Sequence, residues 1–127
     1  MEVGQEFIPL TKEEITHTQL VRYAGASGDF NPIHTVVPFA EKAGLGGVIA
    51  HGMLIMGFVG KAIGTWFDVN RLQKFSVRFN SITRPGEKII VIGSIIGDTN
   101  ETWLCQTKAL NEKGEVKITG SFEVRKN

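Results

Sequence analysis

The sequence predicts an α+β domain in which a curved antiparallel sheet wraps around one long apolar helix. Two features of the chain support this. Residues 50–66 form an apolar stretch of helical length that contains only two titratable side chains, His51 and Lys61. The half of the chain that follows alternates between segments rich in Ile, Val and Phe and short turns rich in Gly, Asn and Asp. Helices followed by regularly spaced strands are typical of an α+β domain rather than of an alternating α/β one.

Two shorter helices are expected ahead of the apolar one. Residues 17–27 follow a sequence that resembles a capping box, with Gln19 three positions after Thr16. Residues 38–43 begin with a proline, which suits the first turn of a helix, and are followed by Gly44, which suits the position after the last turn.

The helix expected from about residue 50 to Trp66 is apolar on nearly all sides, and this pattern places it inside the fold. Gly57, Gly60 and Gly64 lie on or near one face of it. Each glycine costs a helix about 1 kcal/mol relative to alanine. We therefore expect another backbone, such as that of the sheet, to approach this face closely.

The strands are expected from residue 74 onward. Residues 74–80 alternate, so that Phe75, Val77 and Phe79 share one face, which is typical of a half-buried strand. The sequence Arg84-Pro85-Gly86-Glu87 predicts a turn. Further strands are expected over residues 88–96, 102–110 and 115–124. Short turns between such segments predict an antiparallel meander.

The length and composition of the chain limit the classes of function that it can have. At 127 residues the chain forms one domain. Its net charge is +1 with scattered Lys and Arg, which argues against a nucleic-acid partner. The apolar stretch at 47–60 is shorter than the roughly 20 residues that a membrane span needs, and residues 1–6 lack the features of a signal peptide. A cytoplasmic protein is expected. The single Cys105 lies in an expected strand and is interpreted as a small core residue.

Residues 28–34, Gly-Asp-Phe-Asn-Pro-Ile-His, are the most informative stretch for chemistry. Pro32 disfavours a helix through them, so that Asp29 and His34 are able to converge on one point. A carboxylate and an imidazole directed at one water form an acid/base pair. The alternative is an Asx-type turn, in which Asp29 or Asn31 binds the backbone and His34 lies on the surface.

Residues 23–34, Tyr-Ala-Gly-Ala-Ser-Gly-Asp-Phe-Asn-Pro-Ile-His, with Ala40 six positions further on, resemble the signature of the MaoC-like, or R-specific enoyl-CoA hydratase, family of hot-dog folds. Residues 46–53, Gly-Gly-Val-Ile-Ala-His-Gly-Met, are similar to the start of the family's central helix. The resemblance covers nearly the whole chain. One departure is Val36, where many relatives carry an acidic residue.

The resemblance implies the reversible hydration of a trans-2-enoyl thioester to an (R)-3-hydroxyacyl thioester, without a cofactor. Asp29 and His34 match the family's catalytic pair, and Gly52 matches the residue whose backbone N–H meets the thioester oxygen. The first N–H groups of a helix lack internal partners and lie at its positive end, which supports this role independently. The implied substrate is an acyl-CoA or acyl-ACP (acyl carrier protein), entering at the interface of a homodimer that joins two sheets edge to edge.

Other side chains are candidates for substrate binding. Asn31 is expected to fix the turn and to orient His34, or to act in the turn alone. Met53 is expected to pack in the core or to line the acyl pocket. Arg78 and Arg84 are candidates to pair with the phosphates of CoA, although charged residues at such positions are usually solvated.

No metal site is expected. His17, His34 and His51 lack the spacing of a zinc motif, and no group of cysteines assists them. His51 is therefore interpreted as a buried or interface histidine with a hydrogen-bond partner.

Two other functions are compatible with the resemblance. A hot-dog thioesterase uses a carboxylate on the helix, but the chain has no Asp or Glu between Gly44 and Phe67. A non-catalytic partner subunit of a heterodimeric dehydratase is the second alternative, and the presence of both Asp29 and His34 disfavours it.

Overall fold

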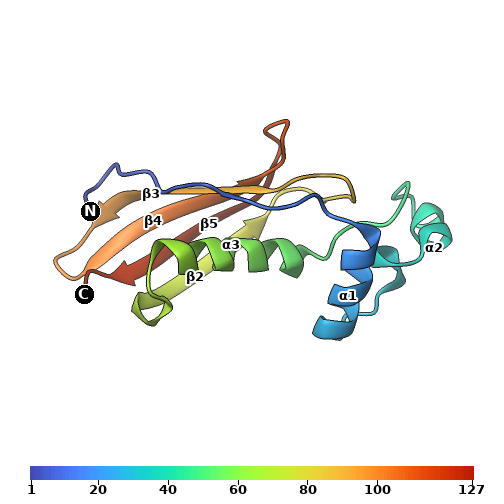
Figure 1. Ribbon diagram of the computed structural model, residues 1–127, viewed down its shortest axis with the longest axis horizontal. Helices are drawn as coiled ribbons and strands as arrows, with labels where there is room; N and C mark the ends of the chain where they lie inside the picture. The colour runs from blue at the N-terminus through green and yellow to red at the C-terminus, as the bar shows by residue number, and fades with distance from the viewer.

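The long helix α3 (Gly52–Trp66) lies along one face of a five-stranded antiparallel sheet in the computed structural model, which describes residues 1–127 (Figure 1). The strands, in the spatial order β1-β3-β4-β5-β2, are β1 (Leu10–Thr11), β3 (Ile90–Asp98), β4 (Thr102–Leu110), β5 (Val116–Arg125) and β2 (Leu72–Phe79). The predicted fold class, α+β with a sheet around one apolar helix, is confirmed.

Helices α1 (His17–Ser27) and α2 (Val37–Lys42) gather at one end of the molecule, opposite both termini (Figure 1). The predicted N-cap of α1 is formed, because the Gln19 N–H donates to Thr16 Oγ1 at 3.0 Å. Helix α2 begins one residue earlier than predicted, with its proline in the first turn. Two 3₁₀ turns, η1 (Pro32–His34) and η2 (Val69–Arg71), complete the helical elements. None of the helices has both the length and the apolar character that a membrane crossing requires.

The core lies between α3 and the concave face of the sheet. One side of α3 is buried through Leu54, Ile55, Phe58, Val59, Ala62 and Ile63. The sheet presents to the core Val91, Ile95, Cys105, Ala109, Ile118, Phe122 and Val124. Full burial of a large apolar side chain contributes about 1.5–3 kcal/mol to stability. Burial raises the pKa of the Cys105 thiol to about 12, so this residue is an unreactive part of the core, as predicted.

The predicted meander is correct for β3, β4 and β5 and wrong for β2. Strand β2 pairs with β5, where Phe75 lies opposite Phe122, and not with β3, its neighbour in sequence. The reason lies in the predicted turn at residues 84–87. Its backbone pairs with the segment before α1, through Gly86 N–H to Ile15 O at 2.7 Å and Ile15 N–H to Glu87 O at 2.9 Å. Residues 80–89 therefore form a crossover between the two sides of the sheet instead of a hairpin.

The prediction for the glycines of α3 is also wrong. A Cβ added at Gly57 or Gly64 would meet nothing within 4 Å, and one at Gly60 would reach only the Phe75 ring at 3.9 Å. Gly57 and Gly64 are exposed, and Gly60 is in ordinary contact with a side chain of β2, so no backbone approaches the three residues closely. The close approaches occur on the strands instead. A Cβ at Gly93 would lie 2.8 Å from the Trp66 ring.

A buried lysine holds the crossover to the sheet. Lys117 is 2% exposed, and its Nζ donates to the carbonyl of Ile82 at 2.7 Å and to the carboxylates of Glu87, at 2.9 Å, and Glu115. Burial alone would raise the pKa of Glu87, but hydrogen bonds from the Lys117 side chain, the Asn111 side chain and a backbone N–H outweigh it and hold that pKa below its ordinary value.

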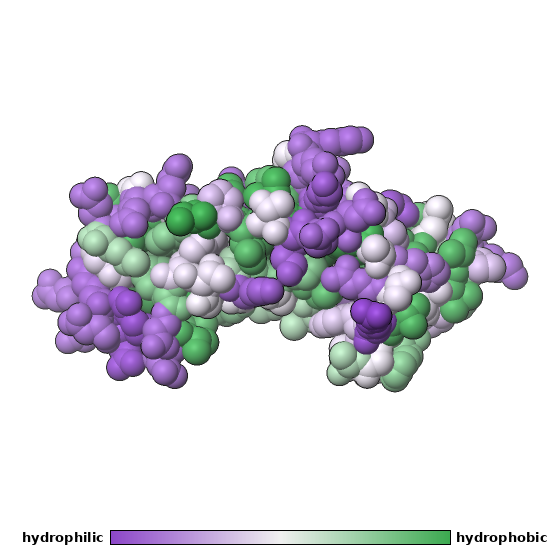
Figure 2. Space-filling model, in the orientation of Figure 1, coloured by the Kyte–Doolittle hydropathy of each residue, from purple (hydrophilic) through white to green (hydrophobic).

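The surface in Figure 2 mixes polar and apolar residues, with apolar ones in view at the end formed by α2. The exposed apolar side chains there are Val36, Val37 and Phe39.

Replacing Lys117 tests its role in the crossover. We expect Lys117→Met to lower the free energy of unfolding by about 3 kcal/mol at pH 7, because it leaves a partly buried carboxylate without its cation. Urea denaturation measures this. Lys74→Met, which removes an exposed pair with Glu123, is the control and should cost less than about 1 kcal/mol.

The same experiment has a pH dependence. The lowered pKa of Glu87 contributes stability above its unfolded pKa, about 4.3, and this contribution is lost as the pH falls through the folded pKa. Lys117→Met should lose less stability than the wild type on acidification. Equal stability of the two proteins at pH 7 would contradict a structural role for Lys117.

Candidate active site

Residues 28–34 form the predicted turn, and no α-helix runs through them, although Pro32–His34 form the 3₁₀ turn η1. The Asn31 N–H donates to Asp29 Oδ1 at 3.2 Å, and the Ile33 N–H donates to Asn31 Oδ1 at 3.2 Å, which starts η1. The Asx-type turn that was weighed as an alternative is thus present. It does not exclude the convergence of Asp29 and His34, because these bonds use Asp29 Oδ1 and leave Oδ2 for other contacts.

Asp29 and His34 converge. Asp29 Oδ2 lies 3.8 Å from His34 Nε2, and the side chains are 53% and 10% exposed, respectively. His34 is buried rather than on the surface. Its Nδ1 lies 2.8 Å from the carbonyl of Ile49 and donates to it, since a carbonyl only accepts. In the neutral ring Nε2 therefore carries the lone pair. At this separation one water can hydrogen-bond to both side chains at about 2.8 Å.

Gly52 is the first residue of α3. Its N–H has no hydrogen-bond partner within the protein, and the N-cap residue His51 makes no side-chain cap. The first bond of the helix runs from Leu54 N–H to His51 O at 3.1 Å. An unpaired N–H at the positive end of a helix is a site for an anionic or polarised oxygen.

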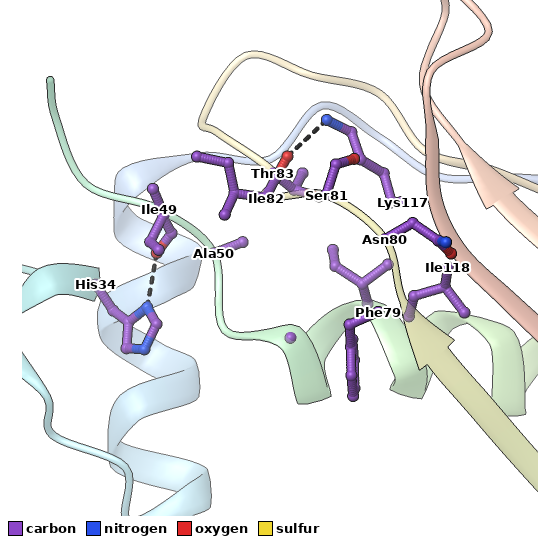
Figure 3. Close-up of a pocket in the computed structure, with 12 residues that line it drawn as sticks. His34, Ile49, Ala50, Phe79, Asn80, Ser81, Ile82, Thr83, Lys117 and Ile118 are labelled. Atoms are coloured by element: carbon purple, nitrogen blue, oxygen red, sulfur yellow. Dashed lines mark hydrogen bonds between the residues drawn. The ribbon is translucent and has the colours of Figure 1, made fainter. Parts of the chain in front are cut away.

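His34 and Gly52 line the same cavity, of about 360 Å³ (Figure 3). Figure 3 shows His34 at one side of this cavity and Lys117 at the other. The apolar lining residues are Ile49, Ala50, Ile55, Phe79, Ile82 and Ile118. Residues 80–83 of the crossover form part of the wall, so the pairing of β2 with β5 shapes the site. The size lies at the small end of the range for ligand pockets, about 300–1,000 Å³.

His51 is the main component of the site that the sequence analysis missed. It is 2% exposed, and its Nε2 lies 3.1 Å from the carbonyl of Asp29. Its ring stacks on that of His34, with centroids 3.8 Å apart and planes at 22°. The predicted buried histidine with a hydrogen-bond partner is confirmed. Its contacts with both members of the pair were not foreseen, although its place beside Gly52 was a signal.

Asp29, His34 and His51 offer three ligand atoms within 4.8 Å of one another, which raises the question of a metal. The lone pair of an imidazole nitrogen lies in the plane of its ring. Because the two rings are stacked at 22°, their planes meet well beyond the roughly 2.0–2.1 Å at which zinc binds such a nitrogen. The three residues as arranged do not fit a metal ion.

Asp29 is not among the residues that line the cavity, and the remaining predicted residues do not line it either. Asn31 shapes the turn through its side chain. Met53 is 56% exposed. Arg78 lines a separate hollow over β2 and β5, and Arg84 lines another with Glu87 and Asn111. Lys117 and Phe79, which do line the cavity, were not predicted as site residues, because a strand pattern alone does not reveal which end of a strand faces a cavity.

Comparisons with known proteins agree with this architecture. The R-hydratase PhaJ1 from Pseudomonas aeruginosa superposes with a TM-score of 0.87 over 98% of this chain and 81% of that one, at 26% identity. The fold is therefore that of the hot-dog proteins. A family model described as the MaoC like domain matches residues 1–116. The chain belongs to the MaoC-like family.

Two curated relatives are much longer proteins. The peroxisomal enoyl-CoA hydratase 2 of Arabidopsis thaliana is 32% identical over 127 residues, which cover 92% of this chain and 38% of that protein. The fatty acid synthase subunit beta of Saccharomyces cerevisiae is 31% identical over 105 residues, 80% of this chain and 5% of that protein. The chain thus spans well under half the length of these relatives.

Proposed function

We propose that this chain catalyses the reversible hydration of trans-2-enoyl thioesters to (R)-3-hydroxyacyl thioesters. One observation carries the proposal: the N–H of Gly52 and the imidazole of His34 line one cavity, with Asp29 3.8 Å from that imidazole. The similarity to an enoyl-CoA hydratase 2 and to an R-hydratase supports it.

In the proposed reaction Asp29 and His34 transfer the protons, and Gly52 binds the thioester oxygen. Water held between Asp29 Oδ2 and His34 Nε2 forms a C–O bond to the β-carbon and gives up a proton to the pair. The electron pair of the double bond moves toward the thioester oxygen, where the Gly52 N–H stabilises the charge by about 2.7–4 kcal/mol. Return of a proton to the α-carbon gives the product. Positioned acid/base groups contribute about 10²–10⁴-fold to such a reaction.

The other predicted residues are assigned to substrate binding. Asn31 acts through the turn that holds Asp29 and His34. Met53 follows Gly52 in the first turn of α3 and is exposed, so it would contact a part of the substrate outside the cavity. Arg78 and Arg84 lie outside the cavity, so they would meet only the distal, phosphate-bearing part of CoA or of an acyl carrier protein.

The rival functions are less well supported. A thioesterase mechanism needs a carboxylate on the central helix, and α3 has none. A non-catalytic subunit has no need of the convergent pair of Asp29 and His34. Release of free thiol from an acyl-CoA would favour the thioesterase.

Replacing either member of the pair tests the proposal. Asp29→Asn and His34→Ala should each lower kcat for crotonyl-CoA by about 10²-fold or more, since each removes a proton acceptor at the water. Loss of absorbance at the enoyl thioester band measures the rate, and circular dichroism checks the fold. A variant with the wild-type rate would remove its residue from the mechanism.

A methyl group at Gly52 tests the proposed carbonyl site. A Cβ at this position would lie 3.0 Å from the Phe79 ring. It would shift the ring or the helix start, and a misplacement of 1 Å can cost about 10²-fold in rate. Gly52→Ala should therefore lower kcat/KM by about 10-fold or more. The matched control is Gly57→Ala in the same helix, where the methyl group meets nothing within 4 Å. Equal rates for both variants would argue against a carbonyl site at Gly52.

We further propose that the chain forms a homodimer through β2. This strand lies at one edge of the sheet, paired on one side only, and such an edge can bind the same edge of a second copy. Sedimentation equilibrium should give twice the mass of one chain. A monomer at micromolar concentration would contradict this arrangement.

A further inference from the structure

Residues 28–31, the segment that carries Asp29, form one hydrogen bond with a residue outside the range 24–34. Every other hydrogen bond of residues 28–31 joins them to a residue between Ala24 and His34. The exception is the contact of the Asp29 carbonyl with His51 Nε2, at 3.1 Å. Because the Asp29 side chain is 53% exposed, packing does little to hold it. The bond to His51 is the one direct hydrogen bond between residues 28–31 and the segment that precedes α3, whereas the bonds of Ile49 hold the later residues Ile33 and His34 of the same turn.

The hydrogen bonding of His51 assigns its tautomer. A carbonyl oxygen only accepts, so Nε2 carries the hydrogen. Nδ1 is buried and has no partner. A buried N–H left without an acceptor costs about 1–3 kcal/mol, so a hydrogen on Nδ1 is disfavoured. His51 therefore holds its single ring hydrogen on Nε2, where it binds Asp29.

The same ring supports His34. The two imidazoles stack with their centroids 3.8 Å apart. The ring of Tyr23 packs against that of His51 in a T-shaped arrangement, with centroids 4.8 Å apart. The hydrogen bond of His34 Nδ1 to Ile49 fixes one edge of the His34 ring. The stacked ring of His51 fixes its plane. Together they leave Nε2 directed toward Asp29.

We propose that His51 is a positioning residue, whose Nε2–H holds Asp29 and whose ring holds His34 in the geometry that binds the reacting water. It touches neither water nor substrate in this role. The bond to Asp29 and the peptide link to Gly52 also tie the acid/base pair to the carbonyl site. The kinetic part of this inference rests on the proposed hydratase function, whereas the structural part does not.

Two substitutions test the hydrogen-bond donor of His51 and its ring separately. His51→Gln keeps an N–H near the position of Nε2 but loses the ring, and His51→Phe keeps a ring for stacking but loses the donor. We expect His51→Phe to lower kcat for crotonyl-CoA by about 10²-fold, the effect of a misplaced reacting group, with KM changed less than about threefold. His51→Gln should recover at least about tenfold of that loss.

The control is His17→Phe. His17 Nε2 also binds a backbone carbonyl close to the turn, that of Thr35 at 2.8 Å, but from an exposed position outside the site. Its kcat should stay within about threefold of the wild type. A wild-type kcat for His51→Phe, or a His51→Gln variant no better than His51→Phe, would overturn the donor role of His51.

Nuclear magnetic resonance gives a test that needs no activity. Long-range ¹H–¹⁵N spectra of the neutral imidazole rings should show the nitrogen-bound hydrogen of His51 on Nε2 and that of His34 on Nδ1. Amide hydrogen exchange in residues 28–31 should be faster in His51→Phe than in His51→Gln. A hydrogen on His51 Nδ1, or equal exchange in both variants, would overturn the inference. If the wild-type chain proves not to hydrate enoyl thioesters, the proposed function fails and these spectra alone decide the structural role of His51.

Discussion

The site depends on residues 49–51, the three-residue segment that precedes α3. Ile49 pairs with the turn in both directions: its N–H donates to Ile33 O at 3.2 Å, and its carbonyl accepts from His34 Nδ1 at 2.8 Å. The next residue binds the crossover, through Ala50 N–H to Thr83 O at 2.7 Å. His51 then binds Asp29. This short extended segment joins the turn, the crossover and the helix.

This arrangement explains how a half-exposed carboxylate is held in a defined position. Binding groups lose efficiency when they are displaced by about 1 Å, and Asp29 lies on a turn at the surface. The turn is stiffened by Pro32 and by its internal hydrogen bonds. The segment at 49–51 then fastens it to α3, which the sheet holds through a continuous core. The crossover is held in turn by the buried Lys117. These contacts connect Asp29 and His34 to the packed core.

Local signals in the sequence predicted most of the secondary structure. The capping residues of α1, the proline of α2 and the alternation in β2 each act within a few residues, so their effect can be read from the chain. The pairing of β2 with β5 could not be predicted in this way. It depends on two residues that are far away in sequence. Ile15 binds the backbone of Gly86 and Glu87, and Lys117 binds the carbonyl of Ile82 and the carboxylate of Glu87. The glycines of α3 were misread for a similar reason, because nothing in a helix pattern states which face the sheet covers.

The site was predicted in part. The spacing of Asp29 and His34 around Pro32 indicated that they converge, and the position of Gly52 at the start of an apolar helix indicated an unpaired N–H. The contacts of His51 were not predicted, because its place beside Gly52 indicates that it lies near the site but does not show which groups it stacks on or binds. Lys117 was missed because a buried lysine needs three acceptors that the fold alone brings together.

The most direct test of this account is a crystal structure of the Asp29→Asn variant with (R)-3-hydroxybutyryl-CoA. We expect the 3-hydroxyl group within about 3 Å of His34 Nε2 and of the side chain at position 29, at hydrogen-bond distance. The thioester oxygen should accept from the N–H of Gly52. A ligand bound with its hydroxyl group away from His34, or with its carbonyl away from the start of α3, would contradict the proposed site.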